Sequence, residues 1–431
     1  MVKKFKSIKN WENKNFDTII DVRSPSEFAS DHIIGAINCP VLSDQEREKV
    51  GNIYKKESTF KAKIIGSSLT ARNIADHIEK NFLEQKGSWQ PLIYCWRGGQ
   101  RSKAFSIILS EVGWRTYQLD GGYKEYRNKV VKFFETIGSK LKIILISGKT
   151  GSAKTKILQS IGELGGQILD LEGLANHKGS LLGKIPGLEQ PSQKLFESKL
   201  FNKLKQLNLK NNIYIEAESS KIGDVHIPKS IWAKMIISPR VEIKADLKLR
   251  ANFLVKDYDY MCKNPELIYP LLNGLKKRLS KNLIDSWKDL ILKKNWIELT
   301  ESFLENHYDP SYTSNTIKND MDTIDLLIHE QEDLYGKHPE QFVDFLDPDS
   351  KYIDRFRKLP KAIRTYIQEY AVNGKFMVRE DIIDKVFGYR QLDITQMKVF
   401  IPIENILKII KKSMPKNLNV FLLFKVIFLN K

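Results

Sequence analysis

Short apolar runs alternate with helical patterns over the first part of the chain. Between residues 16 and 127, the runs DTIIDVRS and PLIYC are bounded by polar or turn residues, which is typical of buried strands. The segments SLTARNIADHIEKNF and SKAFSIILSEVG repeat their apolar residues with the period of a helix. Buried strands that alternate with helices predict an α/β domain with a largely parallel sheet.

The same alternation starts again at KIILISGKTGSAKT, where a buried strand leads directly into a glycine-bearing turn. Further strand candidates, GGQILDLEG and NNIYIEAES, extend this second pattern to about residue 312. From residue 316 on, the sequence becomes mostly helix-forming and charged. We therefore predict an α/β protein of three parts: a first domain over residues 1–134, a second over 135–315, and a mostly helical C-terminal extension of unknown role over 316–431.

The net charge of the chain indicates which kinds of partner it binds. The sequence has 431 residues, and 70 lysines and arginines face 52 acidic residues, which gives a formal net charge of +18. Such a surplus favours polyanionic partners, nucleic acid or diphosphate-bearing ligands.

The cysteines and the apolar stretches indicate the compartment. The three cysteines form no CxxC pair and no zinc-spaced cluster with histidine, which excludes a disulfide scaffold and favours a reducing cytosol. The basic N-terminus lacks the apolar core of a signal peptide. The most apolar stretch, residues 420–429, is interrupted by Lys425 and is shorter than the ~20 residues of a membrane span. We expect a cytoplasmic protein without a membrane span.

The first group of candidate catalytic residues surrounds Cys95. This cysteine follows the strand PLIY and is followed by Arg97, two glycines, Arg101 and a helical segment. Backbone N–H groups at a helix N-terminus bind anions and stabilise a thiolate. A cysteine at a strand end is often only core filling, but the glycines and arginines favour a nucleophile. We therefore predict Cys95, Arg97 and Arg101 as catalytic, and Cys39 and Cys262 as structural.

The second group is a phosphate-binding loop. The segment GKTGSAKT nearly matches the pattern G-x-x-x-x-G-K-[ST], with Ala153 in place of the second glycine. Loop amides and a lysine would surround a diphosphate, and a threonine can ligate Mg²⁺ with a strand-end acid, Glu216 or Glu218. No residue is assigned to a resident metal. The predicted ligand-binding residues of the loop are Gly148, Gly151, Ser152, Lys154 and Thr155.

A third motif, DLEGLANHKGS, follows the next strand of the second domain. A strand that ends in two carboxylates, followed by histidine in a loop, predicts a polar site facing the phosphate loop of an α/β fold. A lone histidine is more often a surface or capping residue, so the neighbouring carboxylates matter to this interpretation. The predicted binding residues are Asp170, Glu172 and His177.

The first domain resembles the rhodanese family. The segments IIDVRSPSEFASDHIIGAINCP and LDGGYKEYR match that family's recurrent blocks. Common single-domain rhodaneses place four residues between the cysteine and the following arginine, whereas five separate Cys95 from Arg101. The longer loop also occurs in rhodanese-fold phosphatases and tyrosine phosphatases. Its length leaves sulfur transfer and phosphate chemistry both open.

The whole of residues 10–315 resembles the bacterial tRNA 2-selenouridine synthase family, which fuses a rhodanese domain to a P-loop domain. Three blocks match in order: Arg97 to Ser102, Asp170 to Ser180, and Tyr308, Asp309, Pro310 and Tyr312. The resemblance implies a transferase that replaces sulfur by selenium at C2 of the wobble 2-thiouridine in a tRNA anticodon loop. It also implies selenophosphate and geranyl diphosphate as co-substrates, and allows for Mg²⁺ and an enzyme that supplies selenophosphate. The chain departs from the family pattern at Ala153, Lys178, Leu182 and Lys244.

Two other classes of function stay open on sequence grounds. One is a rhodanese-type sulfurtransferase, or a rhodanese-fold phosphatase, coupled to an ATP-binding P-loop domain. The other is a non-enzymatic adaptor that binds tRNA. Product analysis on tRNA separates a tRNA-modifying enzyme from an adaptor.

Overall fold

The computed structural model describes residues 5–180, 183–275 and 278–311, and the backbone of three strands at 323–328, 377–378 and 399–400. The chain forms two compact units whose segments interleave along the sequence. The first unit contains Met1–Lys140, Glu172–Asn208 and Ser219–Trp232, and the second contains Leu141–Leu171, Leu209–Glu218 and the chain from Ala233 on. No helix within the described residues is both long and apolar enough to cross a bilayer.

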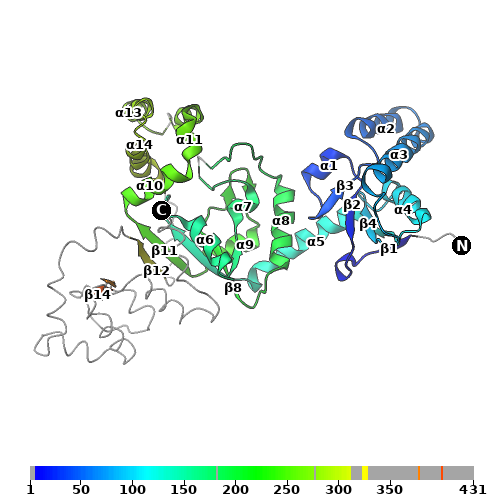
Figure 1. Cartoon of the computed structure of the whole chain (residues 1–431), viewed down its shortest axis with the longest axis horizontal. Coiled ribbons are helices and arrows are strands. Elements are labelled where there is room, and N and C mark those ends of the chain that lie inside the picture. The colour runs from blue at the N-terminus through cyan, green and yellow to red at the C-terminus, as the bar shows by residue number, and fades with distance from the viewer. Residues whose placement is uncertain are drawn as a thin grey trace, which may run out of the picture. The chain divides into compact units, whose positions relative to one another are not determined.

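The first unit is built around a five-stranded sheet in the order β1-β5-β4-β2-β3, in which all neighbours are parallel (Figure 1). All four residues of β4 are buried, as expected for a parallel strand that is covered on both faces. The elements are β1 (Lys6–Ile8), η1 (Trp11–Asn13), β2 (Thr18–Asp21), α1 (Pro25–Ser30), β3 (Ala36–Asn38), α2 (Asp44–Lys56), α3 (Thr59–Asn81), β4 (Pro91–Tyr94), α4 (Gln100–Val112), β5 (Tyr117–Leu119), α5 (Gly122–Thr136), η2 (Ile137–Lys140), α8 (Gln193–Lys205), β9 (Lys221–Ile222) and β10 (Val225–His226).

One apolar cluster of this unit supports the carboxyl ends of the central strands. Ile20 and Ile93, partners across β2 and β4, pack with Phe105 and Leu109 of α4. All four side chains are fully buried, and burial of this size contributes about 1.5–3 kcal/mol per side chain. Cys95 belongs to the same cluster. The cysteine backbone is therefore held by the core of the sheet.

The second unit contains another parallel sheet, in the order β12-β11-β6-β8-β7. Helix α6 packs against β6, β7 and β8 and buries Ile157, Leu158 and Ile161 against Tyr214 and Ile243. The elements are β6 (Lys142–Gly148), α6 (Lys154–Glu163), β7 (Gln167–Leu169), β8 (Asn212–Glu216), β11 (Arg240–Ala245), α10 (Leu247–Asp257), α11 (Asp259–Lys263), η3 (Pro265–Leu267), α12 (Tyr269–Leu275), α13 (Lys281–Leu292), α14 (Trp296–Phe303), η4 (Leu304–Tyr308) and β12 (Thr323–Ile328). Two helices, α7 (Leu171–Ala175) and α9 (Lys229–Ile236), cross the division between the units.

The predicted fold class, two successive α/β regions with parallel sheets, is confirmed. The domain boundaries after residues 134 and 315 stay predictions. Beyond Ser311 the described elements are β12, β13 (Met377–Val378) and β14 (Val399–Phe400). The rest of the predicted helical extension, and the motif residues Leu182 and Tyr312, lie outside the described residues.

Candidate active site

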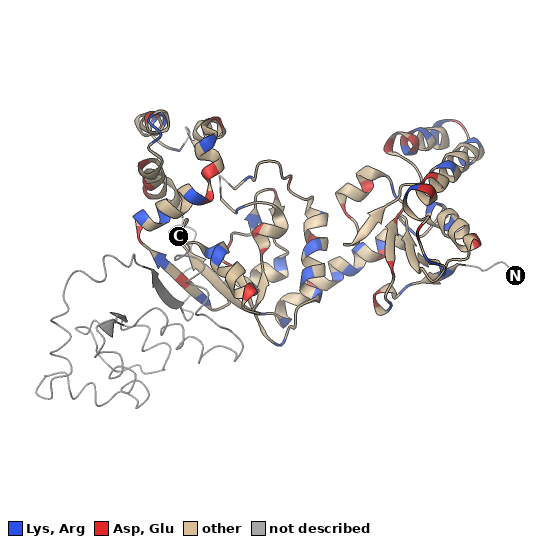
Figure 2. Ribbon diagram, viewed as in Figure 1, with Lys and Arg blue, Asp and Glu red and all other residues tan. Residues whose placement is uncertain are grey.

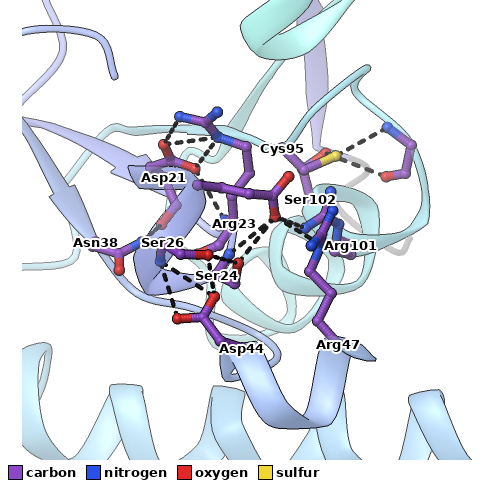
Figure 3. A network of polar contacts seen from close by, with 12 residues as sticks. Asp21, Arg23, Ser24, Ser26, Asn38, Asp44, Arg47, Cys95, Arg101 and Ser102 are labelled. Atoms are coloured by element: carbon purple, nitrogen blue, oxygen red, sulfur yellow. Dashed lines mark hydrogen bonds and ion pairs between the residues drawn. The ribbon is translucent and has the colours of Figure 1, made fainter. Parts of the chain in front are cut away.

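The Cys95 loop connects β4 to α4. Strand β4 ends at Tyr94 and α4 begins at Gln100, so the intervening residues turn the chain over the end of the sheet. The Cys95 sulfur accepts a hydrogen bond from the Gly99 N–H at 3.2 Å and lies 3.1 Å from the Ser102 hydroxyl oxygen (Figure 3). The sulfur is thus held at the N-terminus of a helix of 13 residues, where the helix dipole favours negative charge.

A glycine turn supports this loop from the start of α5. The Cys95 carbonyl accepts the Tyr123 N–H at 2.8 Å. A Cβ atom on Gly122 would lie 2.2 Å from that carbonyl oxygen, and φ at Gly122 is +58°. Only glycine combines this close approach with a left-handed backbone. Gly122 therefore allows the start of α5 to pack directly against the backbone of the cysteine loop.

Arg101 is held by an acidic residue of α1. Its Nη1 lies 2.8 Å from Glu27 Oε2, and Arg47 Nε lies 3.2 Å from the same oxygen (Figure 3). Burial disfavours the charged form of Glu27, but the hydrogen bond and charge of Arg101 outweigh it and lower the pKa of Glu27. The carboxylate is therefore ionised and anchors Arg101 near the loop. Local sequence gives no sign of this role for Glu27, because the carboxylate and the arginine lie 74 residues apart.

Arg97 and Trp96 lie on the exposed side of the same loop. Both residues are exposed, and 39% of the Trp96 surface meets solvent. The centre of its ring lies 5.2 Å from the centre of the Tyr123 ring. More than a third of the Trp96 surface meets solvent, so this residue does not belong to the core. An exposed ring beside the cysteine is available to stack on a planar group.

The other two cysteines are unsuited to nucleophilic chemistry. Burial, together with the charge of Asp21, raises the pKa of Cys39 to about 12. Burial and the charge of Asp259 also raise the pKa of Cys262. Both thiols therefore stay protonated near neutral pH and react poorly.

The phosphate loop lies between β6 and α6 in the second unit. Gly148 and Gly151 have φ values of +148° and +85°, and Ala153 also adopts a left-handed φ of +58°. Lys154 Nζ donates to the Gly148 carbonyl at 2.8 Å, across the loop. Ser152 is buried, and its hydroxyl has no hydrogen-bond partner. The chain thus forms a closed loop whose lysine faces its own first residue.

Carboxylates of the second unit lie near this loop. Burial raises the pKa of Glu216 to about 7, and the charge of Glu218 adds to the shift, while a hydrogen bond from Thr155 and the charge of Lys154 oppose it. Glu216 is 1% exposed, and its Oε2 has no partner. Asp170 raises the same pKa through its charge. Of the two acids that the sequence left open, Glu216 is the buried one.

The structure places Glu172 and His177 in the first unit and Asp170 in the second, so these predicted site residues do not fall within one unit. The His177 N–H donates to the Glu172 carbonyl at 3.1 Å. Burial lowers the pKa of His177, against the charge of Asp224. A Cβ atom on Gly183 would lie 2.7 Å from the His177 ring and 2.8 Å from the Ser180 carbonyl oxygen, so a side chain at this position would force one of them to shift. The shared role predicted for the three residues stays a prediction.

The phosphate loop has a second set of contacts that the sequence did not indicate. Arg250 of α10 is 4% exposed and donates to the Thr150 carbonyl at 3.2 Å. Asp309 accepts from both terminal nitrogens of Arg250 and from Lys149 Nζ at 2.9 Å. The Asp309 carboxylate of the Tyr-Asp-Pro motif thus holds the phosphate loop directly through Lys149 and indirectly through Arg250. The motif was recognisable in sequence, but its target was not.

Two family models match the chain. A rhodanese-like domain model matches residues 3–129, and the model of the tRNA 2-selenouridine synthase AAA domain matches residues 141–332. The tRNA 2-selenouridine synthase of Shewanella frigidimarina is 33% identical over 326 residues, which cover 68% of this chain and 87% of that protein. The tRNA 2-selenouridine synthase of Psychromonas ingrahamii is 30% identical over 327 residues and covers 68% of this chain and 86% of that protein.

Solved structures also include a match. The N-terminal domain of a putative ATP/GTP binding protein from Clostridium difficile is 36% identical, and the match covers 29% of this chain and 99% of that chain, with a TM-score of 0.27.

Proposed function

The chain belongs to the tRNA 2-selenouridine synthase family, and we propose that it replaces sulfur by selenium at C2 of a wobble 2-thiouridine in tRNA. Selenophosphate is the proposed selenium donor, delivered by an enzyme that makes it. The observation that carries the proposal is the Cys95 loop. Its sulfur lies within hydrogen-bond reach of the Gly99 N–H and the Ser102 hydroxyl, which suits a chalcogen or phosphoryl anion.

The proposed exchange has two steps, because a thiocarbonyl sulfur is a poor leaving group. First, the sulfur of the base attacks C1 of geranyl diphosphate, and the diphosphate leaves with the electron pair of the broken C–O bond. The alkylated sulfur then leaves C2 as geranyl thiol when selenium adds. The phosphate loop supports the first step, since Lys154 and the loop amides can neutralise the charge that develops on the diphosphate.

A divalent cation fits the acidic side of this loop. Glu216 Oε2 is buried without a partner, and Thr155 and Glu218 act on the same carboxyl group. Hydroxyl and carboxylate oxygens are the ligands that Mg²⁺ prefers. When bound there, Mg²⁺ would supply positive charge for the diphosphate, with Thr155 and Glu216 as the residues that hold it.

The proposed tRNA surface includes two basic helices of the first unit. Figure 2 shows Lys and Arg along α5 and α8, which pack against each other. Exposed lysines on them are Lys124, Lys132, Lys194 and Lys205. Phosphate contacts position an RNA, whereas an exposed aromatic ring such as Trp96 can stack on a splayed anticodon base.

Nucleoside mass spectrometry tests the proposal directly. Thiolated tRNA, enzyme and geranyl diphosphate should give S-geranyl-2-thiouridine, and addition of selenophosphate should give 2-selenouridine. An adaptor would bind tRNA and leave 2-thiouridine unchanged under both conditions. Unchanged 2-thiouridine with folded protein would reject the proposal.

The rival reading of the phosphate loop as an ATP site is tested by one pair of variants. In Lys154→Ala, the rate of geranylation should fall at least about 100-fold, because the positive charge that neutralises the diphosphate leaving group is removed. Lys156→Ala, an exposed lysine on the same helix, should retain it. ATP hydrolysis stimulated by tRNA would overturn the assignment to an isoprenoid diphosphate.

A further inference from the structure

We propose that Cys95 attacks the phosphorus atom of selenophosphate, so that selenium leaves as hydrogen selenide and the enzyme forms a transient S-phosphocysteine. This inference rests on the proposed function, because selenophosphate is taken as the donor. It assigns the cysteine a phosphoryl-accepting role and makes the selenium itself the nucleophile that reaches the base.

The shape of the loop suits a tetrahedral phosphoryl group. Five residues separate Cys95 from Arg101, and the Gly99 N–H already points at the sulfur, at 3.2 Å. A Cβ atom built on Gly99 meets nothing within 4 Å, so there is open space beside this amide. A phosphoryl group attached to the sulfur would occupy a position where a helix N-terminus favours negative charge.

Ser102 is oriented to assist the departure of the thiolate. Gln118 Nε2 donates to the Ser102 oxygen at 2.8 Å and to the Gly98 carbonyl at 2.7 Å. The Ser102 oxygen accepts this hydrogen bond, its hydroxyl donates to the Gly99 carbonyl at 3.2 Å, and the Cys95 sulfur lies 3.1 Å away. Rotation of the hydroxyl from the carbonyl toward the sulfur therefore brings its proton to a thiolate. A hydroxyl that donates to the sulfur stabilises a thiolate leaving group, which is what hydrolysis of phosphocysteine requires.

Arg101 can contact the anion without leaving its anchor. Glu27 engages Nη1 of Arg101, and a guanidinium carries five N–H donors in a fixed plane. The remaining donors can therefore bind phosphoryl oxygens while Glu27 keeps the side chain near the loop. Arg47 shares the Glu27 carboxylate at 3.2 Å, so the anchor lies between two cations.

The proposed steps balance in atoms and electrons. The Cys95 thiolate forms an S–P bond with HSe–PO₃²⁻, the P–Se bond breaks, and HSe⁻ leaves with its electron pair. HSe⁻ adds to C2 of the S-geranylated base, the C2–S bond breaks, and geranyl thiolate leaves, while the selenium proton passes to the base nitrogen. Water then attacks the phosphocysteine and returns the Cys95 thiolate and dihydrogen phosphate. No oxidant or reductant is needed at any step.

Attack at selenium would have a different electron balance. An S–Se bond would form, and phosphorus would leave with the electron pair as phosphite, which requires reduction of phosphate-level phosphorus. The geometry of the loop, with an amide and a hydroxyl at the sulfur and Arg101 anchored by Glu27 in the helix that follows, is that of a phosphoryl cradle. It favours attack at phosphorus.

The test uses the full-length protein and selenophosphate that carries radioactive phosphorus in one arm and radioactive selenium in the other. After rapid quenching and digestion, the label on the peptide that contains Cys95 is measured. Wild-type protein should carry phosphorus label on Cys95, and Ser102→Ala should accumulate at least about three times more, because hydrolysis slows. Cys95→Ser should carry none, and Cys262→Ser should match the wild type.

Three results would overturn the inference: selenium label on Cys95 without phosphorus label, equal phosphorus labelling in Cys95→Ser, or no phosphorus label in both the wild type and Ser102→Ala. Formation of 2-selenouridine by the same preparation separates this inference from the proposed function. Selenation without phosphorus label rejects the phosphocysteine alone, whereas phosphorus label without selenation of tRNA rejects the proposed function.

Discussion

Asp309 holds both terminal nitrogens of Arg250, with Oδ1–Nη1 and Oδ2–Nη2 distances of 2.8 and 2.9 Å. Arg250 is almost completely buried and also bonds the Thr150 carbonyl. The same carboxylate accepts from Lys149. A residue 160 positions after Lys149 therefore fixes the phosphate loop, and a bidentate arginine pair supplies geometric as well as electrostatic restraint.

Asp309→Asn should destabilise the protein and loosen the loop. A buried guanidinium loses its charged partner, which costs about 1–3 kcal/mol of unfolding free energy. Burial opposes ionisation of Asp309, but Arg250 and Lys149 lower its pKa below 3.8, so its contribution is present above about pH 4 and is lost as the pH falls through the lowered pKa. Urea unfolding at a series of pH values from 7 downward checks both the loss of stability in the variant and the decline of that difference in acid.

The matched control for Asp309 is Asp285→Asn, which breaks the Asp285–Lys288 pair, whose two side chains are only half-buried. It should change stability by less than about 0.5 kcal/mol. Hydrogen exchange of the 148–153 amides should quicken in Asp309→Asn and not in the control. Equal exchange rates in both variants would contradict the role of Asp309 in holding the phosphate loop.

Ala153→Gly should relieve strain in the phosphate loop. A left-handed conformation costs a residue with a Cβ atom about 1–2 kcal/mol, and glycine adopts the φ of +58° freely, although it loses about 0.5–1 kcal/mol through the unfolded chain. The variant should therefore be more stable than the wild type by up to about 1.5 kcal/mol and bind inorganic diphosphate at least as tightly. Thermal unfolding and calorimetric titration measure the two quantities.

Ala251→Gly is the contrasting change in the same unit. Ala251 is buried in the middle of α10, where glycine costs about 1 kcal/mol relative to alanine. If both substitutions stabilise the protein, or neither does, the left-handed backbone at Ala153 is not the source of strain in the phosphate loop.

Glu216→Gln should flatten the dependence of stability on pH. The folded pKa of Glu216 is raised to about 7 from its ordinary value of 4.5, mainly by burial, so the folded state binds more protons than the unfolded state between these values. The unfolding free energy of the wild type therefore falls as the pH rises from about 4.5 to 7, by at most about 1.4 kcal/mol per pH unit. The glutamine variant should lack this slope.

Magnesium ions provide a second test of the role of Glu216. At pH 8 the wild-type carboxylate is charged and buried, so Mg²⁺ should raise the unfolding temperature of the wild type more than that of Glu216→Gln. An equal shift in both proteins would place the cation elsewhere.

Cys95→Ser should separate the two proposed steps. Formation of 2-selenouridine should fall by at least about 100-fold, since a serine hydroxyl is not ionised at neutral pH. Geranylation of 2-thiouridine should continue, because the phosphate loop is intact. Cys39→Ser and Cys262→Ser should both retain selenation, and its loss in either variant with normal folding would remove the reason for singling out Cys95.

Glu27→Gln should weaken selenation through Arg101. The neutral amide keeps the size of the side chain but loses the charge that anchors the guanidinium, and a charge-assisted hydrogen bond is about twice as strong as a neutral one. We expect a fall of roughly 10-fold in selenation and no change in geranylation. Glu57→Gln, which breaks an exposed Glu57–Lys61 pair, should leave both activities unchanged; an equal fall there would refute a specific role for Glu27.

Local pattern was sufficient for the elements that carry the loops. The buried run PLIY and the apolar run before Gly148 predicted β4 and β6, and the structure has both as parallel strands. The helical spacing after each loop predicted α4 and α6. These predictions succeed because burial on both faces and helical periodicity are properties of consecutive residues. The position of Cys95 between a strand and a helix follows from them.

Only the tertiary structure decided which residues serve these loops. Strand β8 lies between β6 and β7, and this pairing buries Glu216 while Glu218 remains half-buried, a choice the sequence left open. The partners Glu27 of Arg101, Gln118 of Ser102 and Asp309 of Arg250 come from 74, 16 and 59 residues away. Spacing along a chain encodes local geometry, whereas such contacts depend on how separate elements meet in space. The sequence alone therefore determined where the two loops lie between a strand and a helix, and the fold determined which residues orient them.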